Sequence, residues 1–111
     1  MELTQGAKMM IDASHSGQQV ALYVGQAAEL RLPENPTTGF RWFVVADGGP
    51  ACRLDDNGFH GADGPPGRGG EHVWGLVGVS AGACDLQLAY RRGFGAAAAG
   101  ETGFALHVEV K

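Results

Sequence analysis

The fold is decided by residues 29–46, which read ELRLPENPTTGFRWFVVA. Residues 29–32 alternate polar and apolar side chains, which is the pattern of a β-strand with one buried face. Residues 40–46 are apolar almost throughout, which is typical of a central strand. The turn between them contains proline, which fixes φ, and ends in glycine, which permits positive φ. This stretch therefore predicts two strands joined by a tight loop.

The same alternation recurs along the rest of the chain and predicts an all-β fold. The further clear segments are residues 19–24, 71–79, 85–90 and 104–110, and the weaker ones are residues 9–11 and 53–59. No segment carries a helical repeat, and 19 glycines among 111 residues disfavour helices. We expect residues 1–111 to form one domain, an immunoglobulin-like two-sheet β-sandwich of seven to eight strands, with a small barrel as the alternative. Residues 1–17 are expected to form a short first strand or to be loosely ordered.

Composition excludes several classes of function. A formal net charge of -4 disfavours nucleic-acid binding, and no apolar run approaches the roughly 18 residues of a membrane helix. The N-terminus lacks a basic start followed by an apolar stretch, so we expect no signal peptide in this sequence. Cys52 and Cys84 permit one disulfide, and two buried thiols are an equally good interpretation.

The histidines do not form a recognisable catalytic or metal site. His15, His60, His72 and His107 are not at ligand spacing with one another, with a cysteine or with a carboxylate. His72 and His107 are expected on the polar faces of their strands. We therefore predict no metal, no cofactor and no catalytic residue. A small enzyme that uses His60 or His72 with Asp55, Asp56 or Glu71 is a weak alternative, because no spacing supports it.

Three loops differ from ordinary connections. The loop 35–39 combines a capping asparagine, a proline and a final glycine, and it carries two threonines that a turn does not need. The loop 64–70 is rich in glycine, which leaves backbone groups open to a partner. The loop 91–95 places Phe94 beside arginine, a combination that suits a binding hot spot. In the expected sandwich, these loops join strands B–C, D–E and F–G and emerge at one end.

In this order, the loops resemble those of the chagasin family, whose members inhibit papain-like cysteine proteases. The family's first motif, Asn-Pro-Thr-Thr-Gly-aromatic followed closely by Trp, is matched by Asn35, Pro36, Thr37, Thr38, Gly39, Phe40 and Trp42. The second motif, Gly-x-Gly-Gly, is matched by Gly67, Arg68, Gly69 and Gly70. The third motif, Arg-Pro-Trp, is changed here to Arg92, Gly93 and Phe94. The resemblance covers about residues 18–111.

The resemblance implies a reversible, non-covalent, tight-binding inhibitor that fills the active-site cleft of a papain-like (C1-type) cysteine protease with loops 35–39, 64–70 and 91–95. It implies that Thr37 and Thr38 lie nearest the catalytic cysteine and histidine. It places residues 67–70 along the non-primed side of the cleft, and Arg92 and Phe94 at an aromatic patch on the primed side.

The altered third motif has an expected cost. Gly93 and Phe94 replace a proline and a tryptophan, and we expect binding weaker by about 1–2 kcal/mol than in a relative with the full motif.

The resemblance also implies a periplasmic or secreted location, because family members are often exported. We expect the free chain to be a monomer. The alternative function is an immunoglobulin-like module that binds a protein or glycan without inhibiting a protease.

Overall fold

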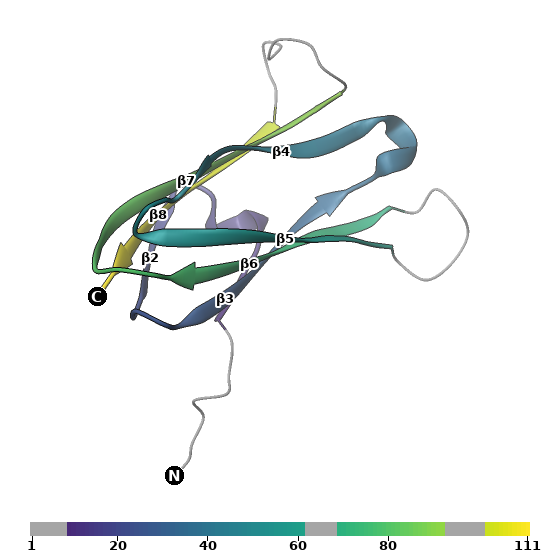
Figure 1. The fold of residues 1–111 in the computed structure, drawn as a ribbon. Helices are drawn as coiled ribbons and strands as arrows, with labels where there is room; N and C mark the ends of the chain where they lie inside the picture. The colour runs from purple at the N-terminus through teal and green to yellow at the C-terminus, as the bar shows by residue number, and fades with distance from the viewer. Residues whose placement is uncertain (1–8, 62–68, 93–101) are drawn as a thin grey trace.

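The alternating segments form eight strands within residues 9–61, 69–92 and 102–111, which are the part of the chain that this computed structural model describes (Figure 1). The strands are β1 (Met9–Ile11), β2 (Gln18–Leu22), β3 (Ala27–Glu34), β4 (Phe40–Asp47), β5 (Cys52–Gly61), β6 (Gly70–Gly78), β7 (Gly82–Arg92) and β8 (Thr102–Val110). Two single 3-10 turns, η2 (Ala13–His15) and η3 (Pro36–Thr38), interrupt them. The first strand expected near the N-terminus is present as β1, and residues 1–8 lie outside the described part.

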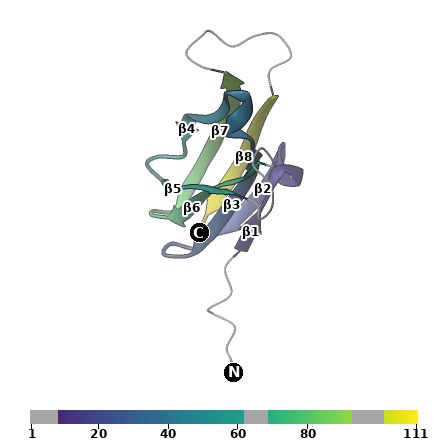
Figure 2. The same cartoon turned by 90° about the vertical axis from the view of Figure 1, so that its right-hand side faces the viewer.

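The strands pair into two four-stranded sheets that face each other (Figure 2). One sheet has the order β1-β3-β6-β5 and the other has the order β2-β8-β7-β4. The first order corresponds to strands A-B-E-D of an immunoglobulin domain, and β8-β7-β4 corresponds to G-F-C. The predicted immunoglobulin-like sandwich is therefore confirmed, and the barrel alternative is excluded because the two sheets have separate edges.

The core lies between the sheets because each strand turns one apolar face inward. The largest fully buried side chains are Trp74, Ile11, Leu22, Leu30, Leu32, Leu76, Leu86 and Val108. Each buried leucine contributes roughly 1.5–3 kcal/mol to folding through the apolar surface that it removes from water. The core therefore holds the sheets in the register on which the loops depend.

Several strands are longer than their sequence pattern predicts, and β5 and β7 are two of them. The weak segment at residues 53–59 belongs to β5, an edge strand of ten residues that pairs with β6. The strand expected to end at Tyr90 continues to Arg92 because its last residues pair with the first residues of β4, Arg92 with Phe40 and Arg91 with Arg41. The prediction that the third loop begins at residue 91 is therefore wrong by two residues.

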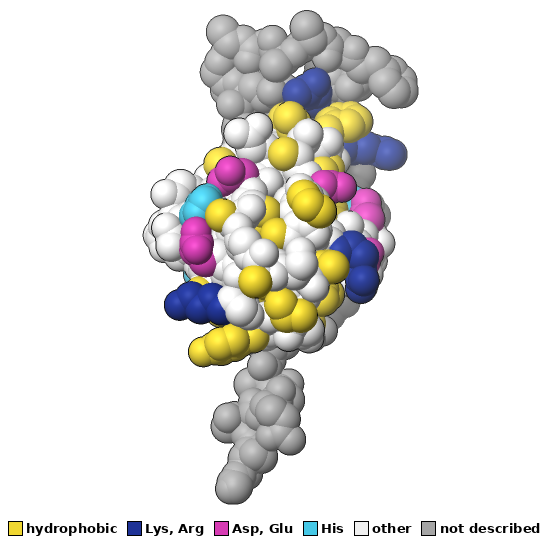
Figure 3. All heavy atoms as spheres, turned by 60° about the vertical axis from the view of Figure 1, so that its left-hand side comes forward, with side chains coloured by type: hydrophobic (Ala, Val, Ile, Leu, Met, Phe, Trp, Pro, Cys, Tyr) yellow, Lys and Arg dark blue, Asp and Glu magenta, His cyan; other side chains and the backbone are white. Residues whose placement is uncertain are grey.

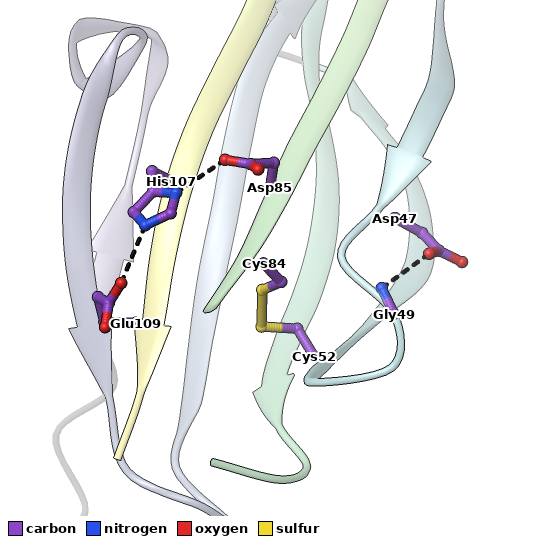
Figure 4. The surroundings of a disulfide bond; sticks show 7 residues. All are labelled: Asp47, Gly49, Cys52, Cys84, Asp85, His107 and Glu109. Atoms are coloured by element: carbon purple, nitrogen blue, oxygen red, sulfur yellow. Dashed lines mark hydrogen bonds and ion pairs between the residues drawn. A yellow bond between two sulfur atoms is a disulfide. The ribbon is translucent and has the colours of Figure 1, made fainter. Parts of the chain in front are cut away.

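Cys52 and Cys84 form a disulfide that joins β5 of one sheet to β7 of the other (Figure 4). Their Cα atoms are 6.7 Å apart, and both residues are buried. Of the two interpretations that the sequence left open, the structure therefore supports the bridge. Because Cys52 pairs with Gly78, the bridge lies at the end of the sandwich opposite the β5–β6 connection.

His107 lies on the outer face of β8, as predicted, between two carboxylates (Figure 4). Its Nδ1 is 2.8 Å from Asp85 Oδ1, and its Nε2 is 3.0 Å from Glu109 Oε2. The hydrogen bond with Asp85, and then the one with Glu109, raises the pKa of His107 above its usual 6.5. We expect an NMR titration of the ring to give a midpoint above 6.5, and the Asp85→Asn variant to give a lower midpoint than the wild type.

The raised pKa also sets the sign of the pH dependence of stability. A group whose pKa is higher in the folded state binds its proton more tightly there than in the unfolded chain. The contribution of His107 is therefore fully present below its unfolded pKa of about 6.5 and is lost as pH rises through the folded pKa. A ring midpoint at or below 6.5 would contradict this assignment.

The surface shown in Figure 3 carries scattered apolar side chains among polar and backbone atoms rather than one continuous block. Tyr23, Val24 and Val79, near one end of the sandwich, are among the exposed apolar residues. Scattered apolar side chains are normal for a folded domain. Within the described ranges, no helix has the length and apolar character needed to cross a membrane.

Candidate functional site

The connections β3–β4, β5–β6 and β7–β8 begin and end at the same end of the sandwich. In the first sheet, Gly70 pairs with both Glu34 and Gly61, which brings the ends of three strands together. In the second sheet, Arg92 pairs with Phe40, and Tyr90 pairs with Thr102. The C-terminus lies at the opposite end (Figure 1). The predicted convergence of the strand ends that carry the three loops is therefore confirmed.

The loop 35–39 is folded tightly by hydrogen bonds of its own. The side chain of Asn35 accepts from the backbone N–H of Thr37 at 3.2 Å and from the Thr37 hydroxyl at 2.6 Å. Thr38 donates to the carbonyl of Asn35 from its N–H at 3.1 Å and from its hydroxyl at 2.7 Å. The loop ends at Gly39, whose φ of 84° favours glycine. The predicted asparagine cap and positive-φ glycine are confirmed, and the turn is one of 3-10 helix.

Aromatic residues of the neighbouring strands hold the base of this loop. The N–H of Asn35 donates to the Tyr90 hydroxyl at 3.0 Å, and the indole N–H of Trp42 donates to the Pro33 carbonyl at 2.8 Å. The ring of Tyr90 lies 5.4 Å from that of Phe40 and 4.9 Å from that of Trp42. Thr37, Thr38 and Gly39 are exposed above this base. The loop is therefore a rigid projection whose tip is free to contact a partner.

The second loop is described only at its end. Gly69 has a φ of 80°, and a Cβ atom there would lie 3.2 Å from the Cβ of Asn35 and 3.2 Å from the carbonyl oxygen of Glu34. A side chain at this position would therefore crowd the first loop, which is a physical reason for glycine. Gly70 is the first residue of β6. Gly67 and Arg68 lie outside the described residues.

The third loop is described only where β7 ends. Arg92 is the last residue of β7 and pairs with Phe40, the first residue of β4. Its backbone therefore starts the third loop beside the end of the first loop. Gly93 and Phe94, which the resemblance assigns to the primed side, lie outside the described residues.

The prediction that His72 lies on a polar strand face is wrong. Residues 72, 74 and 76 share the inner face of β6, and the ring of His72 stacks on Trp74 with 4.2 Å between centroids. Only 15% of the His72 side chain is exposed. Its Nδ1 is 3.0 Å from Glu34 Oε1, and its Nε2 is 2.7 Å from Asp56 Oδ1.

Sequence reasoning missed Glu34 altogether. This carboxylate is 5% exposed, lies at the end of β3 directly before the first loop, and accepts from the N–H of Trp42 at 2.9 Å. The sequence does carry a signal, because Leu30, Leu32 and Glu34 share the period of two that marks the inner face.

The contacts of His60 and His72 bear on the weak enzyme alternative. Asp56 reaches His72, as that alternative requires, and Glu34 contacts the other nitrogen of the ring. His60 contacts the carbonyl of Asn57. In residues 9–61, 69–92 and 102–111, no group of three His, Cys, Asp or Glu side chains could hold a metal ion.

Comparisons with known proteins agree with this architecture. Amebosin, whose solution structure is known, is 28% identical with a TM-score of 0.73, over 96% of this chain and 100% of amebosin. The cysteine protease inhibitor EhICP2 from Entamoeba histolytica is 13% identical with a TM-score of 0.71, over 93% of this chain and 94% of EhICP2. PbICP-C in complex with falcipain-2 is 14% identical with a TM-score of 0.67, over 94% of this chain and 91% of that chain. The last two, at these identities, support the fold alone.

Sequence comparison identifies the family. Chagasin from Trypanosoma cruzi is 42% identical over 33 residues, which are 30% of this chain and 30% of chagasin. The match therefore spans less than a third of the length of chagasin. The model of the chagasin family of peptidase inhibitors (I42) matches residues 21–108, which include all three loops. With most of its length matched and the loop-bearing strand ends at one pole of the sandwich, the chain belongs to the chagasin family of peptidase inhibitors.

Proposed function

We propose that this chain is a reversible, non-covalent inhibitor of papain-like cysteine proteases that blocks the active-site cleft with its three loops. The observation that carries the proposal is the rigid, exposed turn at residues 37–39, which stands at the end of the sandwich where all three connections begin and end. Membership of a family of inhibitors confirms the prediction that the chain is not an enzyme.

The structure of the loop 35–39 favours tight binding. A flexible loop loses conformational entropy when a partner orders it, and this loss weakens the complex. Here the hydroxyls of Thr37 and Thr38 already bond to Asn35, and the N–H of Asn35 bonds to Tyr90. The loop therefore enters the cleft in a conformation that it already holds, and little entropy remains to be lost.

The same loop is a poor substrate. Cleavage requires that a carbonyl carbon approach the catalytic thiolate at about 3–3.5 Å along a defined direction. Pro36–Thr38 forms a 3-10 turn that is closed on itself by the hydrogen bond from Thr38 to the Asn35 carbonyl. A peptide held in this turn does not adopt the extended conformation of a substrate, so the protease is blocked and the inhibitor remains intact.

The second and third loops extend the contact to both sides of the first. Gly69 and Gly70 adjoin the first loop through Asn35 and Glu34, which supports a continuous binding edge. Arg92 starts the third loop beside Phe40. We assign Gly67 and Arg68 to the non-primed side, and Gly93 and Phe94 to the primed side, on the family resemblance.

Titration of papain with the purified chain tests this function. We expect a stoichiometric loss of activity that recovers on dilution, with a single uncleaved inhibitor band on a gel. The reason is that a preorganised loop binds tightly and presents no carbonyl for attack. Retention of full papain activity at excess inhibitor would favour the alternative, an immunoglobulin-like module that binds a protein or glycan.

A further inference from the structure

We propose that Glu34 and His72 are positioning residues for the loop 35–39, and that protonated His72 holds the Glu34 carboxylate where it clamps the base of this loop. The inference rests on the proposed inhibition and names a regulation of the same site by pH. It starts from the buried carboxylate of Glu34 and from His72, whose side chain is half-buried beside it.

Glu34 links the two strands that carry the loop 35–39. Its Oε2 accepts from the N–H of Trp42 at 2.9 Å, and this bond joins the residue before the loop to β4, just beyond it. The bond also joins the two sheets, because Glu34 belongs to β3 and Trp42 belongs to β4. The loop therefore has a fixed width at its base as long as the carboxylate keeps this position.

His72 fixes the other oxygen of the same carboxylate. Its Nδ1 is 3.0 Å from Glu34 Oε1, and its ring stacks on the ring of Trp74. Its Nε2 is 2.7 Å from Oδ1 of Asp56, whose side chain is 62% exposed. The contacts thus connect β3, β4, β5 and β6 at the end of the sandwich that carries the loops.

The donor and acceptor count makes this cluster sensitive to pH. An ionised carboxylate only accepts hydrogen bonds, so both ring nitrogens of His72 must carry a hydrogen to satisfy Glu34 and Asp56 together. Neutral imidazole carries one hydrogen and leaves one nitrogen facing a carboxylate oxygen. The charged groups around the ring are Glu34 from β3, Asp56 from β5 and Arg41 from β4, which lines the same cavity of about 500 Å³. A neutral ring therefore carries no charge to attract Glu34, and it can donate to only one of the two carboxylates at a time.

The test compares inhibition constants for papain between pH 5 and pH 8. The variants are Glu34→Gln, which keeps an acceptor but removes the charge, and His72→Gln. The matched control is His107→Gln, because His107 also lies between two carboxylates but on the outer face of the other sheet. We expect both cluster variants to bind papain about tenfold more weakly than wild type at pH 5, since a charged hydrogen bond is lost. We expect this ratio to be smaller at pH 8 than at pH 5, and the ratio for the control to stay at one at both.

A second readout needs no protease. In the free wild-type chain, the backbone amide signals of Thr37 and Thr38 should shift with the same midpoint as the His72 ring, and His72→Gln should remove that shift. Amide signals that do not follow the ring, or a ratio that is independent of pH, would overturn the proposal. If the wild type fails to inhibit papain at every pH, the proposed function fails, and the amide titration still decides whether Glu34 and His72 hold the loop.

Discussion

Replacement of Gly39 with glutamate is expected to weaken the inhibition of papain about a thousandfold, because a charge buried without a partner at an interface costs several kcal/mol. Gly39 is exposed at the end of the loop 35–39, where the proposed complex brings the loop against the protease. Its φ of 84° adds a second penalty, because a residue with a Cβ atom in this region costs roughly 1–2 kcal/mol. Papain titrations measure the loss of binding as the change in inhibition constant, and urea unfolding measures the backbone penalty as a loss of stability.

Gly25→Glu is the matched control for this variant. Gly25 has a φ of 87°, and a Cβ atom there meets no heavy atom within 4 Å. It lies between β2 and β3 at the opposite end of the sandwich, so the variant carries the same backbone penalty away from the loops. We expect both variants to lose similar stability and only Gly39→Glu to lose inhibition. Equal inhibition by the two variants would show that the loop 35–39 does not contact the enzyme.

The fold could be predicted from the sequence wherever one face of a strand is buried and the other is solvated. Residues 29–32, 85–90 and 104–110 alternate cleanly, and each lies within a strand of the structure. The pattern is weak in β5 because the pairing of β5 with β6 shifts register between Asp56 and Phe59. A shift of register breaks the period of two, so only the partner strand reveals the full length of such an element.

In the candidate site, some residues interact with near neighbours in the sequence and others with residues far away in the sequence. Asn35, Thr38 and Gly39 act on neighbours within four residues, so turn chemistry alone predicts their roles. Glu34 meets His72, which is 38 positions away in the sequence. Their contact depends on the pairing of Leu32 with His72 between β3 and β6, which no local pattern contains. The loop is therefore predictable from the sequence, and the residues that hold it in place are not.

The rigidity of the loop 35–39 and the direction in which it projects depend on different contacts. The turn at residues 36–38 brings its own rigidity, but its direction depends on the strands that carry it. Those strands come from both sheets, and the contacts of Glu34 with Trp42 and of Asn35 with Tyr90 cross from one sheet to the other. Binding strength should therefore respond to how firmly the sheets are joined near the loops, and much less to how they are joined at the far end.

Removal of the disulfide tests the expectation that binding strength responds little to how the sheets are joined at the end far from the loops. The double variant Cys52→Ala/Cys84→Ala removes a bridge between residues 32 apart in the sequence. The unfolded chain then gains conformational entropy, which lowers the free energy of unfolding by about 3–4 kcal/mol. Alanine is used because both positions are buried, and serine would leave a buried hydroxyl there. We expect urea unfolding to report this loss, a large part of the 5–15 kcal/mol typical of a domain.

The bridge lies at the end opposite the loops, so the inhibition constant for papain should stay unchanged under conditions in which the variant is folded. A loss of stability below about 1 kcal/mol, or a weaker inhibition constant in the folded variant, would contradict this view of how the sandwich supports its loops.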